Sequence, residues 1–332
     1  MKRREFLLTL STTALAAPPR TAMGIATTSY MTFRRPRDTH EFLDHCHSIG
    51  AGGIQASLTS LEPPYLKKLR DRADQLGMFI EVMSPLPRQD VAAFERVAAA
   101  AREVNALCLR AACLGGRRYE TFDSLEAWKK FVAESKAAIE RALPILARHR
   151  VRLALENHKD WTVEEMTALV RGASSEYLGI CLDTGNNMAL LDHPVETLEA
   201  FAPYAFSTHI KDMGVEPYED GFLLSEVPLG EGIIDLKRVV ETIRKYHPAT
   251  RMTLEMITRN PLKIPCLTDK YWATFPDRSG RYLARMLALV HAAKRSQPLP
   301  RIDHLDPAAQ LRVEEDNVKQ SLHYARERLG LL

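Results

Sequence analysis

The chain has 332 residues, of which 45% are hydrophobic and 26% charged, a composition that excludes disordered, collagenous and polytopic membrane proteins. The length suits either two average domains or one large α/β barrel. A formal net charge of +3 is too small to suggest a surface that follows nucleic-acid phosphates, so we expect no nucleic-acid partner.

Residues 1–17 have the layout of an export signal. Lys2, Arg3 and Arg4 precede a moderately apolar run, and Ala14-Leu15-Ala16 offers a small-residue cleavage site. The adjacent arginines, followed by Glu-Phe-Leu, resemble the twin-arginine signal, which exports folded proteins from the bacterial cytoplasm. An ordinary secretory leader or a membrane anchor is the alternative, but the run is too short and polar to span a bilayer comfortably. The sequence predicts an exported, periplasmic protein without a stable membrane anchor.

Eight short apolar or β-branched runs follow the leader. They are residues 23–29, 53–58, 78–84, 106–114, 151–158, 178–183, 204–211 and 251–256. Amphipathic helices are expected between them, for example over 39–49, 91–104, 125–148, 195–202 and 236–246, and Thr162 with Glu165 predicts a capping box.

This alternation of strands and helices predicts a parallel sheet, and eight repeats in about 280 residues favour a closed (β/α)8 TIM barrel. A doubly wound sheet is the alternative, but no strand is followed by GxGxxG or GxxxxGK[ST], so its nucleotide-binding form lacks a phosphate loop. We place the barrel at residues 22–295 and a linker and charged helix at 296–332. We expect that helix, at about 307–329, to pack on the barrel or on a second subunit of a homo-oligomer.

Four ionisable residues lie at the ends of the last four runs or within two residues of them: Glu156, Asp183, His209 and Glu255. The carboxyl ends of barrel strands meet at one opening, where TIM-barrel chemistry takes place. Each residue alone has an ordinary structural explanation, as a cap, a core histidine or a salt-bridge partner. Four in succession at inward terminal positions of apolar strands are not explained that way. The gap before Glu255 contains an additional long loop, 213–235, with a hairpin tip expected at 219–221.

Three carboxylates and an imidazole at one opening would repel each other unless a cation lay between them. One divalent metal ion resolves this, and mixed oxygen and nitrogen ligands favour Mn2+, Co2+, Mg2+ or Zn2+. The five cysteines form no CxxC pair and lie mostly in apolar segments, so we expect neither a zinc knuckle nor a disulfide framework.

At these residues the sequence resembles the xylose isomerase-like TIM-barrel superfamily, the sugar phosphate isomerase/epimerase group. The markers are LENH (155–158), CLDTGN (181–186), HIKD (209–212) and LGEGIID (229–235). The resemblance implies that Glu156, Asp183, His209 and Glu255 bind one divalent metal. It also implies that Glu156 and Glu255 move protons on opposite faces of a carbohydrate substrate, next to a carbonyl that the metal polarises.

Five further residues are candidate substrate contacts. His158 and Lys211 share the inward parity of the neighbouring metal ligands, although a salt bridge at the rim would explain them as well. Asn186 and Glu231 are expected to orient the substrate or a ligand. Arg110 ends the fourth strand, where it either faces the barrel interior or pairs with a carboxylate.

The resemblance is incomplete at two places. Ketose 3-epimerases resemble one another in a histidine three residues after the aspartate ligand and an arginine soon after the histidine ligand. Here Asn186 stands at the first place, and no arginine lies between Ile210 and Leu236. A free-ketose epimerase is therefore disfavoured. The early strands also lack the histidines of the three-metal endonucleases in this superfamily.

Three functions follow from these residues. The first is a metal-dependent sugar isomerase or epimerase that works through an enediolate with two glutamates as acid and base. The second is a dehydratase or lyase that eliminates from an oxo-sugar or 3-oxo-glycoside, which suits an exported protein. The third is a non-catalytic carbohydrate-binding barrel, against which the presence of both Glu156 and Glu255 counts.

Overall fold

The structure of the chain is a computed structural model, and it describes residues 19–30, 37–293 and 298–332. The predicted export signal at 1–17 lies outside the described residues, as do residues 294–297 near the expected end of the barrel. Among the described residues, no helix is long and apolar enough to cross a membrane.

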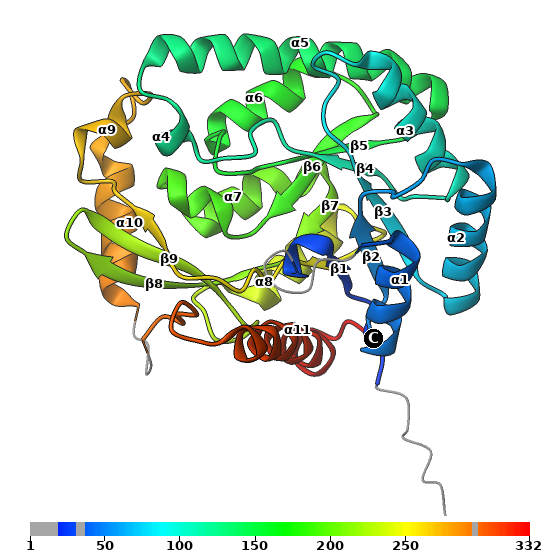
Figure 1. Cartoon of the computed structure of the whole chain (residues 1–332). Coiled ribbons are helices and arrows are strands. Elements are labelled where there is room, and N and C mark those ends of the chain that lie inside the picture. The colour runs from blue at the N-terminus through cyan, green and yellow to red at the C-terminus, as the bar shows by residue number, and fades with distance from the viewer. Residues whose placement is uncertain (1–18, 31–36, 294–297) are drawn as a thin grey trace, which may run out of the picture.

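Eight parallel strands stand side by side in a nearly closed barrel (Figure 1). Their bounds are β1 Gly24–Ala26, β2 Gly53–Ala56, β3 Phe79–Met83, β4 Leu109–Ala111, β5 Leu153–Glu156, β6 Leu178–Asp183, β7 Ala205–His209 and β10 Thr253–Leu254. Neighbours pair in chain order from β1 to β7, and β10 pairs with β1. A parallel bridge between Ile210 and Leu254 links the end of β7 to β10. The predicted (β/α)8 TIM barrel is confirmed.

Helices surround the strands (Figure 1). The longer ones are α1 Thr39–Ser48, α2 Pro63–Leu76, α3 Val91–Glu103, α5 Leu125–His149, α6 Val163–Ala173, α7 Pro194–Phe201, α8 Leu236–Tyr246, α10 Gly280–Ala292 and α11 Pro307–Leu329. The short α- and 3-10 helices are η1 Thr27–Tyr30, α4 Arg118–Thr121, η2 Asn186–Leu190, η3 Ala202–Tyr204 and α9 Asp269–Trp272. The capping box predicted for Thr162 and Glu165 begins α6, and both of its hydrogen bonds are present.

The expected long loop after β7 is largely regular structure. Strands β8 (Asp212–Tyr218) and β9 (Gly221–Val227) form an antiparallel hairpin, and β11 (Leu262–Ile264) pairs with β9. The tip lies at Glu219 and Asp220, as predicted. Pro217 and the charges around it interrupt the strand pattern, which is why the sequence predicted only the tip. The three strands form a small second sheet beside the barrel opening (Figure 1).

Helix α11 takes the eighth place around the barrel, although the sequence placed it outside the eight-unit count. It contacts α8, η1 and β10, and its Glu315 pairs with His45 of α1. Helix α10 instead packs against β8 and β9. The chain after β10 first covers the hairpin and only then returns to the barrel wall, an excursion that strand and helix periods do not reveal.

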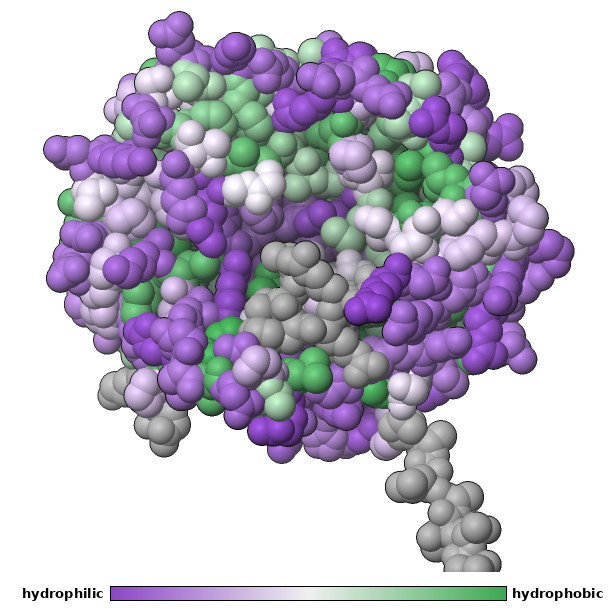
Figure 2. Space-filling model, in the orientation of Figure 1, coloured by the Kyte–Doolittle hydropathy of each residue, from purple (hydrophilic) through white to green (hydrophobic). Residues whose placement is uncertain are grey.

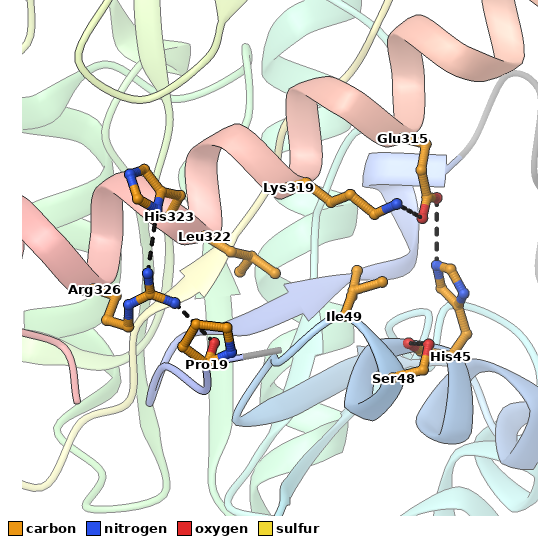
Figure 3. A pocket seen from close by; sticks show the side chains of 9 residues that line it. All are labelled: Pro19, His45, Ser48, Ile49, Glu315, Lys319, Leu322, His323 and Arg326. Atoms are coloured by element: carbon orange, nitrogen blue, oxygen red, sulfur yellow. Dashed lines mark hydrogen bonds and ion pairs between the residues drawn. The ribbon is translucent and has the colours of Figure 1, made fainter. Parts of the chain in front are cut away.

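A cleft of 680 Å³ separates α1 from α11 on the outer wall (Figure 3). His45, Ile49, Glu315 and Lys319 are among its lining residues, and none of the ionisable strand-end residues is. Arg326 closes one end by donating a hydrogen bond to the carbonyl of Pro19, 3.0 Å away. The cleft is thus a feature of the packing between two outer helices.

Small side chains lie two residues before each of the four ionisable strand ends, one step deeper in the barrel. Ala154 and Cys181 are fully buried and pack with Cys108, and Ser207 and Thr253 are fully buried as well. Their small volume leaves room for the larger polar groups that fill the upper barrel.

Asp212, which follows the histidine strand, anchors the turn at residues 230–234. Its carboxylate accepts backbone hydrogen bonds from Met213, Gly230, Gly232 and Ile234 at 2.9–3.1 Å. The approach is so close that a Cβ on Gly232 would lie 2.1 Å from Asp212 Oδ1, so only glycine fits there.

We expect Asp212→Ala to lower the free energy of unfolding by about 2–4 kcal/mol, because it leaves several backbone N–H groups without an acceptor. Denaturant titration measures this change. The matched control is Asp220→Ala at the exposed hairpin tip, which should change stability by less than about 0.5 kcal/mol. Equal losses in the two variants would contradict the anchoring role.

Candidate metal centre

The four ionisable strand ends converge in the barrel opening. Glu156, Asp183 and His209 end β5, β6 and β7, and Glu255 directly follows β10. Each offers one ligand atom, these atoms all lie within 4.8 Å of one another, and all four residues are buried. The strand ends thus bring together the set that the sequence predicted.

Several atoms of this cluster face each other without a hydrogen bond. His209 Nδ1 lies 3.4 Å from Glu156 Oε1, 3.4 Å from Glu255 Oε2 and 3.7 Å from Asp183 Oδ2. Among the described residues, His209 Nδ1, Glu156 Oε2 and Asp183 Oδ2 accept or donate no hydrogen bond, and only the two carboxylate oxygens face a cation, Arg110 and Lys211. Buried polar atoms rarely remain so, and a shared divalent cation would satisfy all three. Three carboxylates and one imidazole are suitable ligands for such an ion.

Opposite charges inside the cluster shift the pKa values of His209 and Glu255 in opposite directions. Burial alone would lower the pKa of His209, but the surrounding negative groups, Glu255 among them, raise it well above its usual value. Burial likewise opposes ionisation of Glu255, yet the charges of His209 and Lys211 hold its pKa well below the usual range. Asp183 is also buried, but the charge of Lys211 lowers its pKa, so these two carboxylates are ionised, and a bound cation would replace the imidazole proton.

Hydrogen bonds from below fix the orientation of the imidazole. Gln55 on β2 donates its amide N–H to Glu81 Oε2 on β3 at 2.8 Å, so its carbonyl oxygen faces His209. His209 Nε2 lies 2.6 Å from that oxygen and must donate, because a carbonyl oxygen only accepts. Nδ1 is then the nitrogen left to bind a metal. Glu81 is fully buried, which raises its pKa.

A similar arrangement orients Asp183. Its Oδ1 accepts backbone hydrogen bonds from Gly185 at 2.8 Å and Asn186 at 2.7 Å, at the start of η2. Its Oδ2 therefore points into the cluster. The local sequence Asp-Thr-Gly-Asn makes this tight turn directly after β6.

Three of the predicted substrate contacts lie in the cluster. Lys211 Nζ is 2.6 Å from Glu255 Oε2 and 3.1 Å from Asp183 Oδ2. Asn186 donates a hydrogen bond to Glu156 Oε1 at 3.1 Å, and Arg110 is in direct contact with Glu156 Oε2. Arg110 therefore faces the barrel interior and also pairs with a carboxylate, so both positions considered for it from the sequence apply.

The other two predicted substrate contacts, His158 and Glu231, lie in different surroundings. His158 is half-buried, its Nδ1 lies 3.1 Å from the carbonyl of Gly116, and burial followed by the charge of Lys159 lowers its pKa well below the usual value. Glu231 is exposed and accepts a hydrogen bond from Gln320 of α11 at 2.6 Å. The Asp212 anchor turns its loop towards α11, so the structure does not bring Glu231 into the cluster.

The sequence interpretation did not include several residues of the opening. Gln55 and Glu81 were detectable, since each is a polar residue inside an apolar strand and both are fully buried. Glu226 of β9 was not, because the hairpin alone carries it to the barrel, where it pairs with Arg259 at 2.6 Å. Burial opposes ionisation of Glu226, but the charges of Arg259 and Lys211 lower its pKa to about 2.

Hydrophilic side chains gather in a hollow near the middle of the face shown in Figure 2. Apolar side chains form much of the surrounding wall in that view. The arrangement suits a small polar molecule rather than a flat macromolecular surface.

Comparison with known proteins gives a consistent result. A family model for the xylose isomerase-like TIM barrel matches residues 43–276. A 3-oxo-isoapionate decarboxylase from Pectobacterium atrosepticum is 29% identical over 235 residues, which are 67% of this chain and 81% of that protein.

Solved structures match by fold. A 3-keto-D-glucoside 4-epimerase from E. coli aligns with a TM-score of 0.56 and 12% identity over 82% of this chain and 100% of that chain. A xylose isomerase-like TIM-barrel protein from Mycobacterium smegmatis, in complex with magnesium, gives a TM-score of 0.55 and 13% identity over 80% and 98% of the two chains. At these identities the likeness shows the fold alone.

The Gln55 hydrogen bond provides a test of the metal centre. We expect Gln55→Leu to weaken Mn2+ binding about 10- to 100-fold, because His209 loses the acceptor that keeps Nδ1 facing the carboxylates. Isothermal titration of the metal measures this, with Gln320→Leu on α11 as the matched control. Unchanged affinity in a folded Gln55→Leu variant would rule out this orienting role.

Proposed function

The chain belongs to the xylose isomerase-like TIM-barrel family, and we propose that it is a divalent-metal-dependent enzyme that removes carbon dioxide from a 3-oxo sugar acid. The 3-oxo-isoapionate decarboxylase relative supports this reaction class. The observation that carries it is the ion pair between Arg110 and Glu156, because the guanidinium keeps Glu156 ionised and leaves Glu255, with the ammonium of Lys211 beside it, as the acid–base pair of the cluster.

The charge around the cluster supports an anionic substrate. Among the described residues, four cationic side chains match four carboxylates at the opening in number. They are Arg110, Lys159, Lys211 and Arg259, against Glu156, Asp183, Glu226 and Glu255. A bound divalent ion would therefore leave a net positive charge, which a substrate carboxylate would neutralise.

When bound, the metal would act as a Lewis acid that polarises the 3-oxo group and stabilises negative charge on its oxygen. The residues that would hold it are Glu156, Asp183, His209 and Glu255. In the reaction, the bond between the carboxylate carbon and C2 breaks, and its electron pair moves towards the 3-oxo group to give an enediolate. Carbon dioxide leaves, and C2 then takes up one proton.

Glu255 and Lys211 are placed to return that proton. Glu255 Oε2 contacts Lys211 Nζ at 2.6 Å, and its Oε1 accepts a hydrogen bond from Thr28 at 2.6 Å. These contacts hold an ammonium and a carboxylate together at the edge of the cluster, where a proton can pass to carbon and be replaced from solvent.

Isomerisation or epimerisation is the second candidate. Glu156 and Glu255 belong to strands on nearly opposite sides of the barrel, an arrangement that suits proton removal on one face and return on the other. That reaction needs two groups that exchange protons. The guanidinium of Arg110 stabilises the ionised form of Glu156 and reduces its tendency to accept a proton. This favours decarboxylation, which needs only one proton-transfer step.

Lys211→Met tests the proposal. With Mn2+ and a 3-oxo sugar acid, we expect the wild-type protein to release one carbon dioxide and add one solvent deuterium at C2 per turnover. The variant should lose about 10²- to 10⁴-fold in kcat while it still binds metal, because it lacks the ammonium that assists proton return. NMR in deuterated water and carbon dioxide detection measure both, with the exposed Lys270→Met as the control.

The alternatives give different products. Carbon–hydrogen exchange without carbon dioxide would indicate epimerisation, and an unsaturated product that absorbs in the ultraviolet would indicate elimination. Absence of turnover with sugar acids, ketoses and 3-oxo-glycosides would favour a non-catalytic carbohydrate-binding barrel.

We also propose export through the twin-arginine route, followed by cleavage near Ala16. The fold supports a cut there, because Pro19 already contacts Arg326, and Thr21 and Ala22 already donate hydrogen bonds to the carbonyl of Leu331. Removal of the leader would leave these contacts intact.

Replacement of both Arg3 and Arg4 by lysine should retain the uncleaved precursor in the cytoplasm, whereas Arg20→Lys should not. Cell fractionation and immunoblotting measure the distribution. Normal export of the double variant would contradict the twin-arginine route.

A further inference from the structure

Lys159 lies just after β5, three positions beyond Glu156, and only 3% of it is exposed. Its ammonium contacts Asn186 Oδ1. The same amide oxygen lies 3.3 Å from Lys211 Nζ, and the amide nitrogen donates to Glu156 Oε1 at 3.1 Å. One asparagine side chain therefore connects Lys159 to the metal cluster.

Lys159 differs from the other cations of the opening in having no carboxylate partner. Arg110 pairs with Glu156, Lys211 with Glu255 and Asp183, and Arg259 with Glu226. In the part of the chain that the structure describes, no carboxylate oxygen lies within 4.0 Å of Lys159 Nζ.

This absence is unfavourable for a buried ammonium. Burial, and then the charges of Lys211 and Arg259, lower the pKa of Lys159 to about 7. Glu226 and Asp183 exert favourable charge effects on Lys159, but Glu226 is paired with Arg259 and Asp183 with Lys211. A negative group that entered the opening would therefore gain more binding free energy from contact with Lys159 than from contact with a cation that is already paired.

We propose that Lys159 binds the carboxylate of the substrate, an assignment that rests on the proposed function. A 3-oxo acid carries its carboxylate two carbons from its carbonyl. With the carbonyl oxygen at the metal cluster and the carboxylate at Lys159, the bond that breaks, between the carboxylate carbon and C2, would lie beside Glu255 and Lys211. Asn186 keeps the ammonium at this position, and the charge of Lys159 selects sugar acids over neutral sugars of the same length.

The test compares two ligands that differ in one group, arabinonate and its neutral counterpart arabitol, on the Mn2+-loaded protein. We expect Lys159→Met to weaken arabinonate binding about 10- to 100-fold, since a charge-assisted hydrogen bond is lost. Arabitol and Mn2+ affinities should stay within about twofold, and Lys159→Arg should recover part of the arabinonate affinity. Calorimetric titration measures all three ligands.

Lys159→Gln serves as the second variant, because its amide N–H can still donate to Asn186 without a charge. Equal losses of arabinonate and arabitol affinity, or undiminished arabinonate binding in either neutral variant, would overturn the assignment of Lys159. The proposed function would still stand in that case, provided that the protein binds Mn2+. Failure of the wild-type protein to bind Mn2+ would instead contradict the proposed function itself.

Discussion

Three buried carboxylates directed at one imidazole nitrogen are the constraint on which the rest of the site depends. Glu156, Asp183 and Glu255 cannot all stay ionised in a water-poor barrel unless positive charge lies among them. A divalent ion would bind Nδ1 of His209, which has no hydrogen-bond partner among the described residues, together with one oxygen of each carboxylate. The eight-strand barrel supplies the geometry, because it brings the ends of distant strands to one opening.

The surrounding residues form layers that follow from this constraint. Below the cluster, Gln55 and Glu81 leave His209 only one nitrogen to offer. Above it, Lys211 and Lys159 share the amide oxygen of Asn186. The same ring of cations that balances the carboxylates becomes a positive opening once a metal binds. Substrate recognition and metal binding are therefore two consequences of one charge distribution.

Much of the fold and of the metal cluster could be predicted from the sequence because both depend on local patterns. Apolar runs of strand length recur eight times, and each ligand ends a barrel strand or directly follows one. The family resemblance rested on the same residues. Features set by the tertiary path could not be predicted. Examples are α11 in the eighth helix position and Glu226, which reaches the opening only because β8 and β9 fold back over it. Glu231 shows the opposite error, since its motif matches the family while its side chain bonds to α11.

Anomalous X-ray diffraction at the manganese edge, from crystals of the mature protein grown with Mn2+, tests the central claim most directly. The account predicts one strong peak per chain, bound by His209 Nδ1 and by oxygens of Glu156, Asp183 and Glu255, at about 2.0–2.3 Å. No peak in the cluster, or an ion bound through Nε2 of His209 with Gln55 displaced, would contradict it.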